Sequence, residues 1–116
     1  MDSTPGPTHT GPGVHLVVDV EKPCAGYALV RVLGDLDVTT AAHLGSRLGE
    51  CVVDPCTIVL DLREVPFVGC AALSVIDAAA DFLHSRGERL VVICGPQARR
   101  ALAVSGVDRR VAVLSV

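Results

Sequence analysis

Aromatic side chains are scarce in this chain of 116 residues: they make up 3% of it, with two phenylalanines, one tyrosine and no tryptophan. Half of the residues are nevertheless hydrophobic. Any core must therefore consist of Val, Leu, Ile and Ala, a composition that suits helices packed on a buried sheet. A chain of this length has room for one domain with one modest core.

Long apolar runs are also missing. The hydrophobic residues fall in short blocks broken by charge or glycine, and none approaches the roughly 20 residues that a membrane-spanning helix needs. The N-terminus lacks the charged and apolar regions of a signal peptide, so we expect a cytoplasmic protein with reduced thiols. Residues 1–13, rich in Pro, Gly and Thr, are expected to form a disordered tail, which leaves 14–116 as the domain.

Positive charge is sparse, since the net charge is −3 and Lys22 is the only lysine. The arginine pairs at 99–100 and 109–110 are expected to be solvated surface charges, so the sequence predicts no nucleic-acid partner. A Gly-rich phosphate loop and a nucleophile elbow are absent, the four histidines are scattered, and the five cysteines lack metal-ligand spacing. The sequence therefore predicts neither an enzyme nor a metal or cofactor site.

The first half of the domain reads as a hairpin followed by a helix. Apolar runs at 14–20 and 27–33 flank a turn-like stretch with Pro and Gly, which indicates an antiparallel hairpin. Residues 39–52 carry apolar side chains at helical spacing. Asp37 or Thr39 is placed to cap the start of that helix.

The second half alternates strands with helices. Strands are expected at 57–62, where the unbroken apolar run suggests burial on both sides, and at 90–94. A helix follows each, opening at 69–70 and at Pro96 and ending at Gly87 and near 106. An edge strand at 111–114 completes the order ββαβαβαβ. The fold class is thus α/β: one domain with a mixed, mostly parallel sheet of four to five strands and three to four helices.

Three short segments of this pattern resemble the STAS domain. They are Gly-Asp-Leu-Asp at 34–37, Asp-Leu-Arg-Glu-Val-Pro-Phe at 61–67 and Ser-Gly-Val at 105–107. Each follows a predicted strand or helix in the family's order, and the similarity runs from about residue 14 to the C-terminus. The family contains anti-sigma factor antagonists and the cytoplasmic tails of sulfate transporters.

The resemblance implies a binding module that is switched by phosphorylation. In antagonist members the loop after the third strand continues Phe-x-Asp-Ser-Ser-Gly, and a kinase-type anti-sigma factor phosphorylates the first serine. Here the acidic position is Gly69, the phosphoacceptor position is Cys70, and Ala71 and Ala72 follow. Since a thiol does not accept phosphate from a serine kinase in a comparably stable form, three interpretations stay open: constitutive binding, another switch, or a lost partner.

A redox switch is one such alternative. A thiol at the start of a helix is favoured as thiolate by the helix dipole, and Cys94 is expected at the end of the strand beside the one that leads to Cys70. Cys70 is equally explained as a small residue in place of serine. Thr39, Thr40 and Ser74 are other hydroxyls near the same face, with helix capping as the simpler explanation for the threonines.

The resemblance implies an anti-sigma factor antagonist that sequesters a serine-kinase-type anti-sigma factor and so frees a sigma factor. The protein is expected to be a monomer or weak dimer. A non-catalytic STAS scaffold or a small-ligand sensor subunit is the alternative. The partner-binding face is expected to comprise Asp35, Asp37, Thr39, Thr40, Gly69, Cys70, Ala71 and Leu73.

Overall fold

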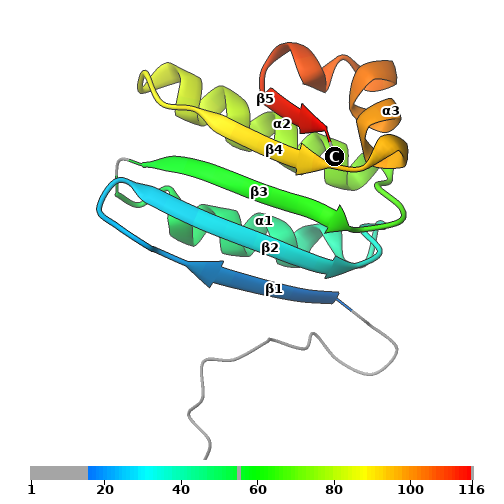
Figure 1. The fold of residues 1–116 in the computed structure, drawn as a ribbon, viewed down its shortest axis with the longest axis horizontal. Coiled ribbons are helices and arrows are strands. Elements are labelled where there is room, and N and C mark those ends of the chain that lie inside the picture. The colour runs from blue at the N-terminus through cyan, green and yellow to red at the C-terminus, as the bar shows by residue number, and fades with distance from the viewer. Residues whose placement is uncertain (1–15, 55, 116) are drawn as a thin grey trace, which may run out of the picture.

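The computed structural model describes residues 16–54 and 56–115, and the element order confirms the predicted alternation (Figure 1). The elements are β1 (Leu16–Glu21), β2 (Tyr27–Gly34), α1 (Ala41–Cys51), β3 (Thr57–Glu64), α2 (Cys70–Ser85), β4 (Leu90–Cys94), α3 (Pro96–Ser105), the short 3-10 helix η1 (Val107–Arg109) and β5 (Ala112–Ser115). The predicted tail at 1–13 lies outside the described residues.

The five strands form one sheet in the order β1-β2-β3-β4-β5. β1 pairs with β2 antiparallel, with Val18 opposite Val32, and the other neighbours are parallel. The hairpin turn contains Gly26 at a φ of 86°, a value that favours glycine. Both the hairpin and the mixed, mostly parallel sheet are therefore confirmed.

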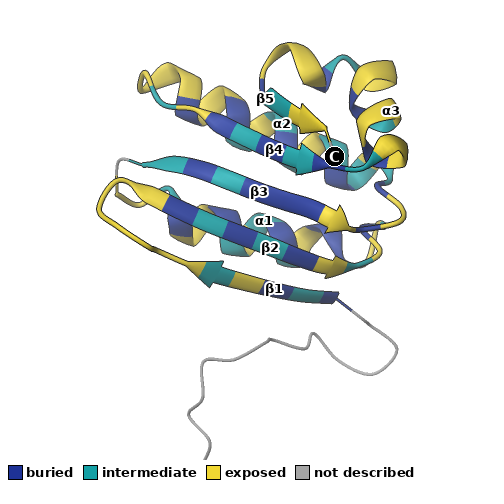
Figure 2. Cartoon of the chain, viewed as in Figure 1, coloured by how far each residue is buried: buried dark blue, intermediate teal, exposed yellow. Residues whose placement is uncertain are grey.

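Helices α1 and α2 pack side by side on one face of the sheet (Figure 1). Their buried positions recur at helical spacing: Ala41, Leu44, Leu48 and Cys51 in α1, and Ala72, Ile76, Ala80 and Leu83 in α2. The strands alternate in the same way, with buried residues interleaved with partly exposed ones (Figure 2). The core is thus aliphatic, as the composition predicts, and lies between these helices and the sheet.

The expectation that strand 57–62 is buried on both sides is wrong. Ile58, Leu60 and Leu62 are fully buried toward the helices, whereas Val59, on the opposite face, is only partly buried. No helix covers β1, β2 and β3 on the face turned to the viewer in Figure 1, within the described part of the chain. The apolar run reflects burial by neighbouring strands and helices on one side, which sequence alone does not separate from burial on two sides.

Asp61 is buried on this open face because arginine side chains cover it. Arg63 donates from Nε to Oδ1 at 3.0 Å and from Nη2 to Oδ2 at 2.8 Å, and Arg31 Nε lies 3.6 Å from Oδ2. The hydrogen bond from Arg63 is the main reason that the pKa of Asp61 is lowered. A charged group in the middle of a sheet is stabilised here by a bidentate ion pair.

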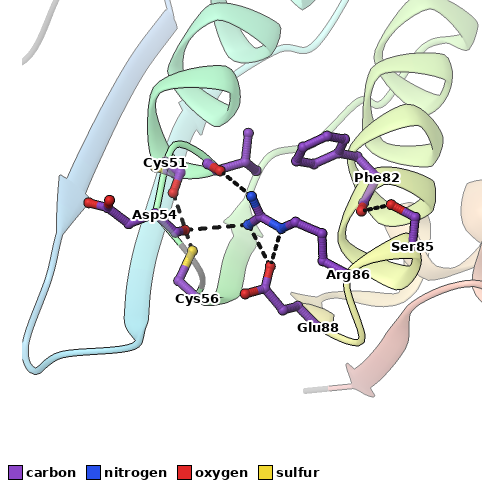
Figure 3. A network of polar contacts seen from close by, with 8 residues as sticks. Cys51, Asp54, Cys56, Phe82, Ser85, Arg86 and Glu88 are labelled. Atoms are coloured by element: carbon purple, nitrogen blue, oxygen red, sulfur yellow. Dashed lines mark hydrogen bonds and ion pairs between the residues drawn. The ribbon is translucent and has the colours of Figure 1, made fainter.

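At the amino ends of the parallel strands, Arg86 ties α1 to α2 (Figure 3). Its guanidinium donates to the backbone oxygens of Val52 at 2.8 Å and Asp54 at 3.4 Å, pairs with Glu88, and lies 4.8 Å from the centre of the Phe82 ring. The end of α1 thereby gains donors for its free carbonyl groups. Side chains thus join the ends of α1 and α2 here.

Candidate functional site

Two loops meet at the carboxyl ends of β2 and β3. The N–H of Leu36, between β2 and α1, donates to the carbonyl of Phe67 at 2.9 Å, and the N–H of Gly69, before α2, donates to the carbonyl of Leu36 at 2.7 Å. Leu36 and Val68 form a parallel bridge. We call residues 35–40 and 67–73 together the loop face; backbone hydrogen bonds hold its two halves as one surface.

Asp37 organises the first half of the loop face. Its Oδ1 accepts the N–H of Thr39 at 2.9 Å and of Thr40 at 3.0 Å, while its own N–H donates to Thr40 Oγ1 at 2.9 Å. The Asp37 carbonyl also accepts the N–H of Ala41, the first residue of α1, at 2.9 Å. The N-cap of α1 is Thr40, which makes no side-chain capping bond. The prediction that Asp37 or Thr39 caps the helix is therefore wrong, and Asp37 instead holds the turn that leads into it.

Those hydrogen bonds also favour the ionised form of the Asp37 carboxyl group. The hydroxyl of Thr39 donates to Oδ1 at 2.7 Å, and together with the Thr40 amide it lowers the pKa of the carboxyl group. Asp35 lies beside it and is exposed. Thr40 is buried and its hydroxyl donates to the Asp35 carbonyl at 2.8 Å, so Thr40 shapes the loop and offers no free group to a partner.

The second half of the loop face leads into α2. Gly69 is the N-cap and Cys70 the first helical residue, with an exposed side chain. A Cβ on Gly69 would lie 3.1 Å from the Phe67 ring and 3.3 Å from the Leu36 carbonyl oxygen. An acidic residue here, which the resemblance implies for antagonist members, would require the Phe67 ring to move. The observed position of that ring therefore depends on glycine at position 69.

Two apolar side chains of the loop face are exposed: Val38 by 78% and Phe67 by 54%. Sequence reasoning did not assign them to the site. The sequence does mark these two residues as unusual, because both lie in loops outside the apolar periodicity of the strands and helices. Whether such a residue is exposed or joins the core depends on its neighbours in the fold, which the sequence does not show. Ala71 and Leu73 are partly buried and pack against the core, so only part of each side chain is accessible at the loop face.

The cysteines occupy different environments. Cys70 is exposed, whereas Cys94 is fully buried at the end of β4, where burial raises the pKa of its thiol. Burial raises the thiol pKa of Cys51 and Cys56 too, and Cys56 donates to the Cys51 carbonyl at 3.2 Å. All five cysteines are free.

Across residues 16–54 and 56–115, His, Cys, Asp and Glu form no group able to hold a metal ion. None of the helices in that part of the chain is long and apolar enough to cross a bilayer.

The family model of the STAS domain matches residues 16–115, which is the whole described fold. The chain therefore belongs to the STAS domain family.

Its relatives within the family are anti-sigma factor antagonists. The anti-sigma-F factor antagonist RsfB of Mycobacterium tuberculosis is 33% identical over 85 residues, which cover 72% of this chain and 70% of RsfB. An anti-sigma factor antagonist from Mycobacterium paratuberculosis has a similar crystal structure, with a TM-score of 0.76, 30% identity and 85% of each chain covered. The antagonist SpoIIAA in its unphosphorylated form shares the fold, with a TM-score of 0.74 over 85% of this chain and 87% of SpoIIAA at 14% identity.

Proposed function

We propose that this domain acts in the cytoplasm as an anti-sigma factor antagonist: its loop face binds a serine-kinase-type anti-sigma factor and thereby frees a sigma factor for transcription. The observation that carries the proposal is the joining of residues 35–40 to 67–73 by the hydrogen bonds of Leu36. A surface built in this way is preorganised, so that a partner does not have to order the loops when it binds.

The chemistry of the loop face suits a protein partner. Val38 and Phe67 present exposed apolar surface, and the carboxylates of Asp35 and Asp37 lie on the first of its two loops. An apolar centre with polar groups around it is the usual anatomy of a protein interface. We expect Val38 and Phe67 to supply most of the affinity and the aspartates to favour a basic rim on the partner.

Cys70 changes how this binding is regulated. A phosphate at this position would add −1.5 to −2 charges close to Phe67 and would weaken docking, but a thiol does not take that modification from a serine kinase. We infer that the domain either binds constitutively or responds to oxidation of Cys70. Cys94 is buried and its thiol pKa is raised, so of these two thiols Cys70 is the one that an oxidant would reach first.

The proposal is tested by a pulldown from host lysate, with and without reductant, followed by mass spectrometry. Capture of a kinase-like anti-sigma factor in both lanes supports a constitutive antagonist. Capture in the reduced lane alone supports a cysteine switch. The absence of such a kinase from both lanes contradicts the proposal, and copurification of STAS-repeat proteins would favour the scaffold instead.

A matched pair of variants separates the two modes of regulation. Cys70→Ser restores the family's phosphoacceptor, so we expect the isolated anti-sigma factor to phosphorylate it with ATP while leaving the wild type unmodified. Cys70→Ala removes the thiol and leaves no acceptor. If peroxide weakens binding of the wild type but not of Cys70→Ala, the switch is the thiol; if it weakens neither, binding is constitutive.

A further inference from the structure

Two adjoining cavities open at the end of the molecule opposite the loop face. The larger, of about 420 Å³, lies where β4 and β5 begin and is lined by His84, Arg89, Arg109 and Arg110 among others. The smaller, of about 220 Å³, shares three of these residues, His84, Arg109 and Arg110, and is also lined by the carboxylate of Asp81. The shared residues make the two cavities parts of one depression, which we call the arginine cavity.

The arginine cavity is cationic although the chain has a net charge of −3. Three arginines line the larger cavity, and its single carboxylate, Glu88, is paired with Arg86. Within residues 16–54 and 56–115, Arg89 and Arg109 make no ion pair. Asp77 and Asp81 offset the charge of Arg110, so the positive charge that favours an anion here comes from Arg89 and Arg109.

Arg110 is held in place for such a role. Its Nε lies 3.2 Å from Asp77 Oδ1 and its Nη1 lies 3.1 Å from Asp81 Oδ1, both on α2. These two contacts fix the plane of the guanidinium. A preoriented guanidinium loses less conformational entropy on binding than a free one.

The end of α2 does not oppose an anion strongly. The N–H of Glu88 donates to the Leu83 carbonyl at 2.8 Å, and the N–H of Gly87 donates to the His84 carbonyl at 3.0 Å. This pattern, with Gly87 at a φ of 75°, is the helix-closing motif that satisfies the last carbonyl groups. The negative helix terminus is thus already hydrogen-bonded within the chain.

We propose that the arginine cavity binds a small phosphate dianion, either inorganic phosphate or the phosphate of a small organic monoester. Guanidinium groups match phosphate oxygens through paired, charge-assisted hydrogen bonds, and the volume of the larger cavity, about 420 Å³, suits a small molecule. The loop face lies at the carboxyl ends of β2 and β3, whereas this cavity lies at the amino ends of β4 and β5. Ligand binding here is therefore separate from partner binding and does not depend on the proposed function.

The test is a titration of the full, ¹⁵N-labelled chain with inorganic phosphate at pH 8, in buffer whose ionic strength is held constant with sodium chloride. Saturable amide shifts are expected around Gly87, Leu90 and Ala112. Arg109→Gln and Arg89→Gln should each weaken affinity about tenfold, because each removes one charge-assisted contact. Arg100→Gln is the control, since Arg100 is exposed on α3 and lines neither cavity; it should bind like the wild type.

Glycerol 3-phosphate distinguishes the two sources of the anion. Tighter binding of the ester supports an organic phosphate, and equal or weaker binding supports free phosphate. The proposal is overturned if neither ligand gives saturable shifts at these amides, if chloride alone reproduces them, or if Arg109→Gln and Arg89→Gln bind as well as Arg100→Gln.

Discussion

The two ends of the sheet are built by different means. At the carboxyl ends of β2 and β3, backbone groups join the loops: Leu36 bonds to Phe67 and Gly69 through main-chain N–H and C=O groups. At the opposite end, side chains join α1 to α2, above all Arg86 with its bonds to two backbone oxygens and to Glu88 (Figure 3).

The difference explains which positions are free to serve a partner. Because backbone atoms hold the loop face together, the exposed side chains of Val38, Phe67 and Cys70 are not needed to maintain its structure. A cysteine in place of the serine of antagonist members therefore leaves the loop face intact. Arg86, in contrast, makes contacts that hold the fold together. We therefore expect substitutions at the loop face to change binding and substitutions around Arg86 to change stability.

The largest expected effect is on partner affinity. Phe67→Asp should weaken binding to the anti-sigma factor about a hundredfold, and Val38→Asp about thirtyfold, because each places a carboxylate in the apolar centre of the interface. Isothermal titration calorimetry measures this, with denaturant unfolding as a check. Unchanged affinity, or a loss of stability as large as the loss of binding, would contradict the division between the two ends.

Arg86→Ala should show the opposite behaviour. The substitution leaves carbonyl groups at the end of α1 without their donor, so we expect the free energy of unfolding to fall by about 1–2 kcal/mol. Affinity for the partner should stay the same. Arg100→Ala, which removes an exposed arginine from α3, is the matched control and should change neither quantity; an equal loss of stability there would remove the role given to the Arg86 network.

Asp37 is the exception at the loop face, because its side chain is part of the backbone scaffold. Asp37→Ala removes the acceptor for two backbone amides, so the melting temperature should fall by a few degrees and binding should weaken as well. Asp35→Ala removes an equal charge from the same loop but no side-chain acceptor for these amides. Differential scanning calorimetry should find the Asp35 variant as stable as the wild type, and a similar fall in both variants would rule out this role of the Asp37 hydrogen bonds.

The smallest expected effect is on the pH dependence of stability. The hydrogen bond from Arg63 lowers the pKa of Asp61 in the folded state, so its stabilisation is present above the unfolded-state pKa of about 4 and is lost as pH falls through the folded value. Between pH 5 and pH 2, the wild type should lose stability more steeply than Asp61→Asn. Parallel curves in urea titrations at each pH would show that Asp61 has no such linkage.

The order of elements was predictable because local signals agree with the final structure. Gly87 and Gly106 end helices, Pro96 begins one, and the periods of apolar residues separate strands from helices. The open sheet face was not predictable from the run at 57–62, because the same apolar sequence is compatible with helices on one face of the sheet or on both. Burial of Asp61 was missed for a related reason: it depends on the side chains that cover the carboxylate, Arg63 on the same strand and Arg31 on the neighbouring one.

The site was predictable in part. The pattern at 34–37 and 61–67 located both loops, but the capping expectation placed Asp37 at the helix start, whereas its hydrogen bonds hold the turn before α1. Exposure of Val38 and Phe67 and burial of Thr40 depend on how the loops cross, which no local signal reports. The contact between the Phe67 ring and Gly69 likewise exists only once the two loops are joined.

The most direct test of the account is the affinity of the anti-sigma factor for Cys70→Glu compared with Cys24→Glu. Both variants exchange an exposed cysteine for a carboxylate, but Cys24 lies in the turn between β1 and β2, at the opposite end of the sheet. The account predicts at least tenfold weaker binding for Cys70→Glu, because negative charge at the start of α2 enters the interface, and wild-type binding for Cys24→Glu. Equal affinities for the two variants would contradict it and remove the loop face from the interface.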